Sequence, residues 1–344
     1  MALSVLIVDD SSFFRKRLNE IISADANLEV VGTAEDGEQA IEQAKRLKPD
    51  IITMDIEMPK MDGITAVRHI MAESPTAILI LSNDSTEGAK STFQALDAGA
   101  VDYMPKQFGD IEKDQVLAQQ RFCQRLHNLA LSYQHQHPST TNIPPEKPAP
   151  SSLDTKLKLV AIGTSTGGPI ALQKVLSQLP ASFPHPLLII QHMPATFTPS
   201  FSERLNTQCA IKVKQAEDGN ILSPGVAYIA PGGQQMRVKG TKVQPFLQIK
   251  DSEPNQAYQP CIDITFESIA AICPAETLAI ILTGMGSDGR EGCRQLKQLN
   301  AVVWSQDEQS STIYGMPMAV AKANLTDKVL SLSDMGQQLS EIKV

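Results

Sequence analysis

The chain has 344 residues, of which 42% are hydrophobic and 20% charged, and its formal net charge is −8. This length exceeds one ordinary hydrophobic core, so two domains of roughly 100–200 residues each are expected. An acidic chain without a run of lysine or arginine is not attracted to a phosphate backbone, and we expect no nucleic-acid partner.

The five cysteines are scattered along the chain. They form no C-x-x-C pair and have no neighbouring histidines, which argues against a zinc site or a disulfide framework. The N-terminus lacks the basic segment and apolar stretch of a secretory leader, and no run of about 18 apolar residues occurs. We therefore expect a soluble, cytoplasmic protein with reduced thiols and no membrane insertion.

Residues 1–133 alternate short β-branched runs with helix-length amphipathic segments. The strand candidates are residues 3–8, 28–34, 49–54, 76–81 and 100–104. This alternation predicts an α/β domain with a five-stranded parallel (βα)5 fold.

Acidic, hydroxyl and basic side chains stand where these predicted strands end. Asp9 and Asp10 end the first strand, and Asp55 ends the third. Ser82 ends the fourth strand, and Lys106 follows the fifth. Three carboxylates at one edge of a parallel sheet need a cation, and all-oxygen ligands suit octahedral Mg²⁺. The set predicts a phosphoryl-acceptor site, although single aspartates at strand ends more often cap helices or begin turns.

The same stretch resembles the response-regulator receiver family over essentially residues 1–130. The matching residues are V-D-D at 8–10, MDIEMPKMDG at 54–63, Ser82, and Tyr103 three residues before Lys106. The resemblance implies that Ser82 and Tyr103 couple phosphorylation to a change of the domain surface.

The receiver resemblance also implies that Asp55 is the phosphorylated residue. By the same resemblance, Asp10, Asp55 and the backbone carbonyl of Glu57 hold Mg²⁺, and Asp9 acts through water. The added charge and acceptor oxygens of a phosphoryl group would draw the neighbouring hydroxyl and ammonium groups toward it. Gln107 stands where the family usually has proline, so loop geometry or switching rate is expected to differ.

Residues 134–156 read QHQHPSTTNIPPEKPAPSSLDTK. Proline removes backbone donors, and the apolar residues are too few to form a core, so a semi-extended linker is predicted. His135 and His137 are more typical of solvated polar chain than of a metal site.

Residues 157–344 return to an alternation of strands and helices without repeating the first half. The strand candidates are 157–162, 186–191, 226–230, 277–283 and 301–305, and the helices include 169–179 and 288–299. We expect a second α/β domain of the doubly wound, mostly parallel kind.

Three turns in this second half each follow a predicted strand and carry one polar side chain, which are Ser165, His192 and Asp288. The carboxyl ends of parallel strands share one edge, so the three groups can meet despite their spacing in sequence. A serine hydroxyl becomes a nucleophile when an imidazole accepts its proton and a carboxylate orients that imidazole. The G-x-S-x-G pattern at 163–167 suits a nucleophile elbow that would hold the serine exposed, with helix-start N–H groups facing an oxyanion.

Other interpretations of these residues are open. The glycine-rich turn at 163–167 could cradle a phosphate, although it lacks a Lys-Ser/Thr ending and G-x-G-x-x-G spacing. Ser-Asp-Gly at 287–289 could only cap the next helix. His185, between Phe-Pro and Pro, is expected to be a surface loop residue.

The second half closely resembles the chemotaxis protein-glutamate methylesterase (CheB) family, from about Leu157 to the C-terminus. The matching segments are AIGTSTGGP, QHMPATFTPSFSERL, AEDGNILSPGVAYIAPGG, ILTGMGSDGREG and SQDEQSSTIYGMP. The resemblance implies that Ser165 is the nucleophile, His192 the general base and then acid, and Asp288 its orienting carboxylate. It places Thr166 and Met285 beside the reacting carbonyl, with the Met285 backbone a candidate oxyanion donor.

The implied activity is hydrolysis of glutamate methyl esters on the cytoplasmic helices of chemoreceptors, with release of methanol and without a cofactor. Deamidation of receptor glutamines uses the same acyl-enzyme chemistry. A chemotaxis histidine kinase is the implied phosphodonor, and phosphorylation would shift the receiver away from the catalytic crevice. The alternatives are a phosphorylation-dependent scaffold with a weak or inactive pocket, and a related esterase or amidase acting on a non-receptor protein.

The chain departs from the family pattern outside the triad. Relatives usually read A-P-G-G-x-H-M, R-P-S-V-D and G-M-P-R where this chain has Gln235, Gln259-Pro260-Cys261-Ile262-Asp263 and Met318. Loss of basic or ring-nitrogen groups near a crevice would weaken recognition of an acidic receptor helix more than acyl chemistry. Neutral change on the surface is the alternative.

Overall fold

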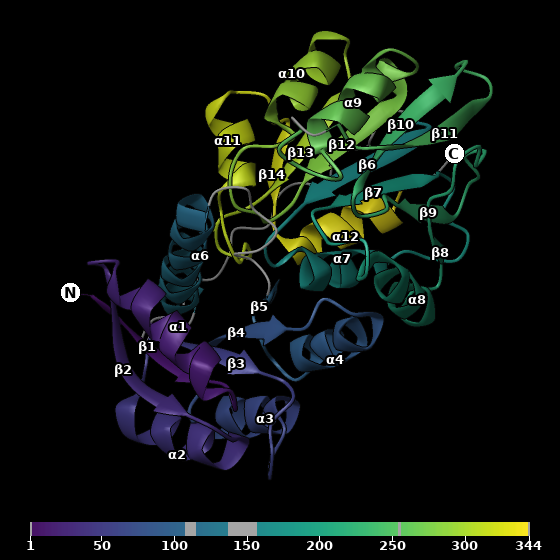
Figure 1. The fold of residues 1–344 in the computed structure, drawn as a ribbon. Coiled ribbons are helices and arrows are strands. Elements are labelled where there is room, and N and C mark those ends of the chain that lie inside the picture. The colour runs from purple at the N-terminus through teal and green to yellow at the C-terminus, as the bar shows by residue number, and fades with distance from the viewer. Residues whose placement is uncertain (1, 107–114, 137–156, 254–255, 343–344) are drawn as a thin grey trace. The chain divides into compact units, whose positions relative to one another are not determined.

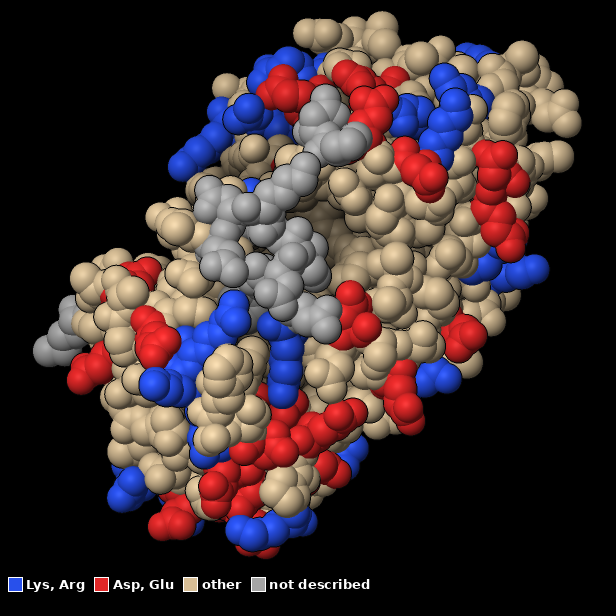
Figure 2. All heavy atoms as spheres, viewed as in Figure 1, with Lys and Arg blue, Asp and Glu red and all other residues tan. Residues whose placement is uncertain are grey.

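The computed structural model describes residues 2–106, 115–136, 157–253 and 256–342 (Figure 1). The chain divides into two compact units, Met1–Pro138 and Ser139–Val344. No helix among the described residues is both long enough and apolar enough to cross a membrane. On the face seen in Figure 2, acidic and basic side chains lie interspersed over both units.

The first unit is built on a parallel sheet with strand order β2-β1-β3-β4-β5. Its strands are β1 (Leu3–Val8), β2 (Leu28–Ala34), β3 (Ile51–Asp55), β4 (Ala77–Ser82) and β5 (Asp102–Pro105). Its helices are α1 (Ser12–Ser23), α2 (Gly37–Leu47), α3 (Gly63–Glu73), α4 (Thr86–Asp97) and α6 (Gln115–Gln136). The predicted (βα)5 fold is confirmed. The chain direction across the sheet reverses at β1 and β3, whose carboxyl ends therefore border a crevice.

The helices of this unit begin where side-chain oxygens accept backbone N–H groups. Ser11 accepts from Phe14 at the start of α1, and Asp62 accepts from Thr65 at the start of α3. Such N-caps each stabilise a helix by about 0.5–2 kcal/mol. Ser11 and Asp62 each lie between a strand that carries site residues and the helix that follows it. Their capping hydrogen bonds therefore help to hold these two connections in place.

Helix α6 continues beyond the predicted start of the linker. It ends at Gln136, and the carboxamide of Gln134 donates to Asp50 Oδ1 at 2.6 Å. Residues 134–136 are therefore helical rather than semi-extended, and the first proline of the segment comes only at Pro138. The rest of the predicted linker, residues 137–156, lies outside the described residues.

The second unit is built on a seven-stranded parallel sheet with order β14-β13-β12-β6-β7-β9-β8. Its strands are β6 (Leu159–Thr164), β7 (Leu187–Gln191), β8 (Lys212–Gln215), β9 (Val226–Ile229), β12 (Thr277–Ile281), β13 (Val302–Gln306) and β14 (Lys328–Leu330). A separate antiparallel hairpin consists of β10 (Gln234–Gly240) and β11 (Pro245–Asp251). The predicted doubly wound, mostly parallel fold is confirmed, but β8, β10, β11 and β14 are not among the predicted strands.

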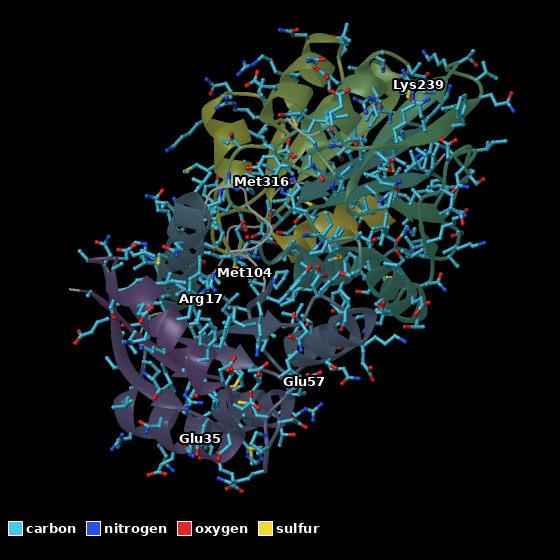
Figure 3. The ribbon with its side chains drawn as sticks, in the orientation of Figure 1. Arg17, Glu35, Glu57, Met104, Lys239 and Met316 are labelled. Atoms are coloured by element: carbon cyan, nitrogen blue, oxygen red, sulfur yellow. The ribbon has the colours of Figure 1, made fainter. Side chains whose placement is uncertain are left out.

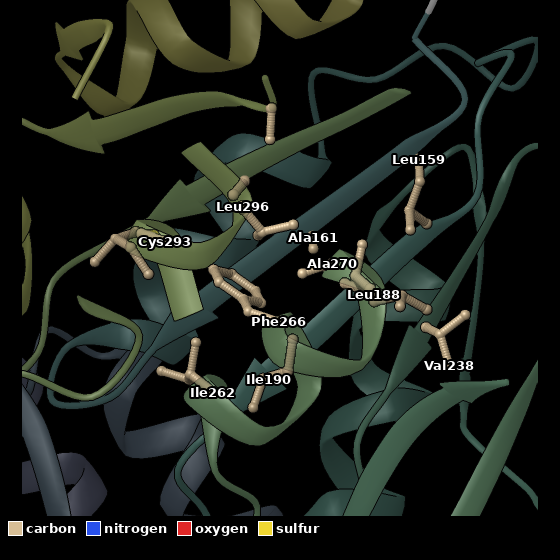
Figure 4. Packing of buried hydrophobic residues seen from close by; sticks show 14 of the residues in the cluster. Leu159, Ala161, Leu188, Ile190, Val238, Ile262, Phe266, Ala270, Cys293 and Leu296 are labelled. Atoms are coloured by element: carbon tan, nitrogen blue, oxygen red, sulfur yellow. The ribbon is translucent and has the colours of Figure 1, made fainter. Parts of the chain in front are cut away.

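Helices cover both faces of this sheet (Figure 1). They are α7 (Gly168–Leu176), α8 (Thr198–Gln208), α9 (Ile262–Ala270), a 3-10 turn (Pro274–Glu276), α10 (Arg290–Gln298), α11 (Met316–Lys322) and α12 (Leu332–Ser340). Helices α9 and α10 pack over one face, where Ile262, Phe266 and Leu296 join Leu188 and Ile190 of β7 in a buried apolar cluster (Figure 4). This cluster fixes the start of α9 against the sheet.

The strand order also places the crevice of the second unit. After β6 the chain moves to β7 on one side, and later strands return to β12 on the other side of β6. In open α/β sheets, ligands bind outside the carboxyl ends of the strands at such a reversal. The segments that follow β6, β7 and β12 therefore border the expected binding site.

Candidate functional site

Three carboxylates and one lysine meet at the carboxyl edge of the first sheet. Oxygens of Asp9, Asp10 and Asp55 all lie within 4.8 Å of one another. Lys106 Nζ lies 2.8 Å from Asp9 Oδ2 and 2.7 Å from Asp55 Oδ2. The structure thus brings together the four charged groups that the strand ends predict, and the oxygen donors of the three carboxylates fit Mg²⁺.

The charges of this cluster are set by burial and by one another. Burial raises the pKa of Asp55 to about 6, and the ammonium of Lys106 opposes that rise. Burial alone would lower the pKa of Lys106, but its hydrogen bonds to Asp55 and Asp9 outweigh this effect and raise it. The lysine therefore stays charged and favours ionised carboxylates beside it.

Ser82, Tyr103 and Glu57 lie around the same edge. The Ser82 hydroxyl is buried and has no hydrogen-bond partner among the described residues. Tyr103 is buried with its ring edge-on to Phe93, the centroids 6.3 Å apart. Glu57, labelled in Figure 3 just beyond β3, accepts a hydrogen bond from the Asn83 carboxamide at 3.2 Å. Gln107 lies outside the described residues.

A glycine lets the loop after β3 fold tightly behind Asp55. A Cβ on Gly63 would lie 1.9 Å from the carbonyl oxygen of Asp55, closer than any side chain tolerates. Gly63 also donates its backbone N–H to the carbonyl of Ile56. The final glycine of the MDIEMPKMDG segment is therefore required by its close approach to the Asp55 backbone rather than by turn conformation.

In the second unit, Ser165 directly follows β6. Its backbone N–H donates to the carbonyl of Thr283 at 3.0 Å, and its carbonyl accepts from Gly168 at 2.8 Å. The left-handed conformation of this turn falls on Gly167, with φ 75°. The sequence predicts an exposed serine, whereas Ser165 is only partly exposed in the tight turn.

His192 follows β7, the neighbour of β6, and contacts the third predicted residue. Its Nε2 lies 2.7 Å from Asp288 Oδ2. Asp288 also accepts backbone hydrogen bonds from Ile262 (2.8 Å), Asp263 (3.1 Å) and Gly289 (3.0 Å). Burial raises the pKa of Asp288, but the bonds from His192 and the backbone outweigh burial and hold it below the usual value. The carboxylate is thus ionised and fixed on one edge of the imidazole.

Gln191, which is not among the predicted site residues, connects the first two of them. Its carboxamide nitrogen donates to the carbonyl of Ser165 at 2.9 Å and to the carbonyl of His192 at 3.0 Å. A polar residue at the buried end of β7, directly before the histidine, is the signal that could have indicated it. The side chain therefore connects the backbones that carry the hydroxyl and the imidazole.

Thr166 follows Ser165 in the chain, and Met285 follows a glycine that packs against Ser165. Thr166 is buried, and its carbonyl accepts from the Thr283 hydroxyl at 2.9 Å. Gly284, which precedes Met285, packs so closely that a Cβ there would lie 2.9 Å from Ser165 Cβ. Both positions are therefore close to the candidate nucleophile.

His185 lies apart from this site, and its predicted surface position is wrong. It is 6% exposed and packs edge-on against Phe183, and burial lowers its pKa. The apolar residues on both sides, Phe183 and the start of β7, draw it into the interior. It has no contact with the candidate catalytic residues among those described.

The three family departures occupy different environments. Gln235 is 1% exposed, so a neutral surface change does not describe it. Gln259 is exposed and Met318, on α11, is half-buried. On the same helix, Figure 3 labels Met316, which is fully buried. The surface interpretation thus fits Gln259 and fails for Gln235.

Comparison with known proteins follows this division into units. The family model described as CheB methylesterase matches residues 160–339, and the model described as response regulator receiver domain matches residues 5–118. A Pseudomonas putida protein named protein-glutamate methylesterase/protein-glutamine glutaminase of group 1 operon is 50% identical, with 99% of each chain covered. A Vibrio vulnificus relative, protein-glutamate methylesterase/protein-glutamine glutaminase 1, is 49% identical over 98% of each chain.

A solved structure is similar to the second unit. The catalytic domain of the Thermotoga maritima CheB methylesterase superimposes with a TM-score of 0.52 at 37% identity, covering 54% of this chain and 98% of that one. The matched families, the full-length relatives and the two observed sheets agree with one another. The chain therefore belongs to the CheB methylesterase family and carries a response regulator receiver domain ahead of its methylesterase domain.

Proposed function

We propose that this chain is a phosphorylation-regulated serine hydrolase that demethylates glutamate methyl esters on chemoreceptors and deamidates receptor glutamines. The observation that carries the proposal is the 2.7 Å contact of His192 with Asp288 beside the strand end that bears Ser165. The names of the full-length relatives support the substrate class. The chain would act in the cytoplasm, on the cytoplasmic helices of the receptors.

In the proposed first step, Ser165 Oγ attacks the γ-carbonyl carbon of the ester, and His192 accepts the hydroxyl proton. Because the ionised Asp288 accepts from Nε2, Nδ1 is the nitrogen left to take that proton. His192 then gives the proton to the departing methoxide, which leaves as methanol. The remaining acyl group is bonded to Ser165.

In the second step, His192 removes a proton from water, and the hydroxide attacks the acyl carbon. Breakdown returns the proton to Ser165 and releases a glutamate carboxylate. The Met285 backbone N–H and the Thr166 region would stabilise the oxyanion of both tetrahedral intermediates, which is typically the largest electrostatic contribution to acyl transfer. For glutamine, ammonia replaces methanol as the leaving group. These steps need no cofactor.

In the receiver, Asp55 would accept a phosphoryl group from a chemotaxis histidine kinase. Asp10, Asp55 and the carbonyl of Glu57 would hold Mg²⁺, with Asp9 acting through water, and the metal would neutralise charge on the phosphoryl oxygens. Lys106, whose Nζ lies 2.7 Å from Asp55 Oδ2, would hold a phosphoryl oxygen. The Ser82 hydroxyl, which has no hydrogen-bond partner among the described residues, would donate to another. Ser82 and Tyr103 would then couple phosphorylation to a change of the receiver surface.

We assign residues 1–133 to the receiver, 134–156 to the linker, and 157–344 to the hydrolase. Phosphorylation would act as a population shift between a receiver docked over the catalytic crevice and one released from it. A change of about 1.4 kcal/mol in that equilibrium alters the ratio of open to closed forms about tenfold.

The test is methanol release from methylated receptor by the full chain and by Ser165→Ala, each with and without Mg²⁺ and a small phosphodonor. We expect release by the wild type, stimulation by the phosphodonor, and loss in Ser165→Ala. Release that persists in Ser165→Ala would reject the nucleophile. Absence of release by the wild type would reject the receptor ester as substrate.

A further inference from the structure

The segment 256–261 lies against the catalytic pair and is held by one buried side chain. Gln235, on β10, donates from Nε2 to the Tyr258 carbonyl at 2.8 Å and to Gln256 Oε1 at 3.1 Å. Its Oε1 accepts the backbone N–H of Cys261 at 2.9 Å. Gln235 is 1% exposed, and its carboxamide nitrogen and oxygen therefore both hold backbone groups of this one segment in place.

The first contact of this segment with the site is an aromatic stack. The ring of Tyr258 lies parallel to the imidazole of His192, with centroids 4.3 Å apart and an interplanar angle of 8°. Asp288 contacts the imidazole at Nε2, and a single contact at one ring atom does not by itself fix the tilt of the ring plane. A parallel neighbour restrains that tilt, and its π face stabilises the imidazolium formed during proton transfer.

The second contact is made by a thiol. Cys261 Sγ lies 3.3 Å from Asp288 Oδ1, the oxygen not bonded to His192. Burial, and then the charge of Asp288, raise the pKa of Cys261 to about 12, so the thiol keeps its proton and can donate it in a hydrogen bond. The segment therefore touches the imidazole with one side chain and the carboxylate with another.

We propose that Tyr258 and Cys261 are positioning residues for His192 and Asp288, and that Gln235 holds both of them in place. This inference rests on the proposed hydrolase function. It assigns a role to three residues whose positions depart from, or border departures from, the family pattern. In this chain a buried carboxamide organises the catalytic pair instead of recognising substrate.

The decisive comparison is Tyr258→Phe with Tyr258→Leu in the full chain treated with Mg²⁺ and phosphodonor. Phenylalanine keeps the stacked ring, so kcat for methanol release should stay within about twofold of the wild type. Leucine removes it, and kcat should fall about 3- to 10-fold with KM within about twofold. Unchanged kcat in Tyr258→Leu, or a rise in KM alone, would overturn the positioning role; the latter would indicate a substrate contact.

An NMR measurement tests the stack without turnover. The ring current of Tyr258 should shift the His192 ring protons upfield in protein labelled at histidine. The shift should persist in Tyr258→Phe and disappear in Tyr258→Leu. Its absence in the wild type would refute the stack even if methanol is released. Loss of methanol release with the shift intact would instead count against the hydrolase function.

The support by Gln235 and Cys261 has its own variants. Cys261→Ser keeps a donor and should retain kcat, whereas Cys261→Ala should lower it about 2- to 5-fold. Gln235→Leu should lower kcat and abolish the ring-current shift, and adding Tyr258→Leu should cause little further loss because the two act together. Gln234→Leu, on the adjacent position of β10, is the matched control and should change neither. A Gln235→Leu variant with the ring-current shift and kcat of the wild type would show that the segment 256–261 keeps its position without Gln235, and would overturn the supporting role.

Discussion

The carboxamide of Gln191 donates to the carbonyl of Ser165 at 2.9 Å, so the strand that carries the base also holds the turn that carries the nucleophile. The same nitrogen reaches the carbonyl of His192 at 3.0 Å. A Cβ on Gly168 would lie 2.0 Å from Gln191 Oε1, which shows how closely the turn packs on this side chain. The relative position of hydroxyl and imidazole is therefore set by one buried amide.

Replacement of Gln191 should impair both stability and turnover. Gln191→Leu leaves two partly buried carbonyls without this donor, and we expect a loss of about 1–3 kcal/mol in the free energy of unfolding. Gln191→Glu should be worse, because it places carboxylate oxygens against those carbonyls. Urea unfolding of the full chain, followed alongside methanol release, checks the order of the two variants. Equal stability of all three proteins would contradict the bridging role.

Asp288→Asn should inactivate the hydrolase through its effect on His192. A carboxylate only accepts, and it fixes the proton on Nε2, whereas an amide can donate to Nε2 and select the wrong tautomer. We expect kcat to fall by about 10²–10⁴-fold with KM little changed. Steady-state methanol release gives both constants. Asp263→Asn, next to the same site, is a useful comparison, and an equal loss there would indicate a general electrostatic effect.

The stability of the receiver should depend on pH through Asp55. Burial raises the pKa of this carboxyl to about 6 in the folded state, above about 3.9 in an unfolded chain, so the folded state binds the proton more tightly. Stability from this group is therefore greatest below about pH 4, falls between about pH 4 and 6, and levels above pH 6. Thermal unfolding of wild type and Asp55→Asn in Mg²⁺-free buffer should diverge over that range. Parallel curves would contradict the buried, ionised carboxylate.

Mg²⁺ should stabilise the wild-type receiver at neutral pH. Binding to the folded site alone raises stability with metal concentration, by about 2.7 kcal/mol at 100 times the dissociation constant. Asp10→Asn and Asp55→Asn should each lose most of this response. Titration of the unfolding midpoint with Mg²⁺, and with Ca²⁺ for selectivity, measures it. An unchanged response in both variants would place the metal elsewhere.

The strand ends made much of this architecture predictable. Asp55 and Ser165 each follow a run of buried apolar residues, and in a parallel sheet such positions share an edge whatever their distance in sequence. The position of Asp288 could be predicted by the same argument, since this residue lies in the loop after β12. Motif resemblance then assigned chemistry to these positions. Strand periodicity and motif spacing thus agreed, which is the condition under which sequence reasoning is reliable.

The supporting contacts were not predictable in the same way. The stack of Tyr258 on His192 depends on how a hairpin and the segment after it fold over the sheet, and no local pattern encodes that path. Gln235 looks like a surface substitution until its strand is seen to pack against α9. His185 shows the converse error, because proline neighbours suggested a surface loop where Phe183 draws the ring inward. Side-chain partners across tertiary contacts need coordinates.

The backbone hydrogen bonds from Ile262 and Asp263 to Asp288 limit which sequence changes this protein can accept. These two N–H groups lie in the first turn of α9. The N-cap residue Cys261 makes no side-chain capping hydrogen bond, and the carboxylate of Asp288, from the loop after β12, caps the helix instead. The positive end of α9 in turn favours the anionic form of that acid. The start of α9 and the orientation of His192 therefore both depend on the position of Asp288. Insertions between β12 and α10 would move this residue and impair helix and proton transfer together.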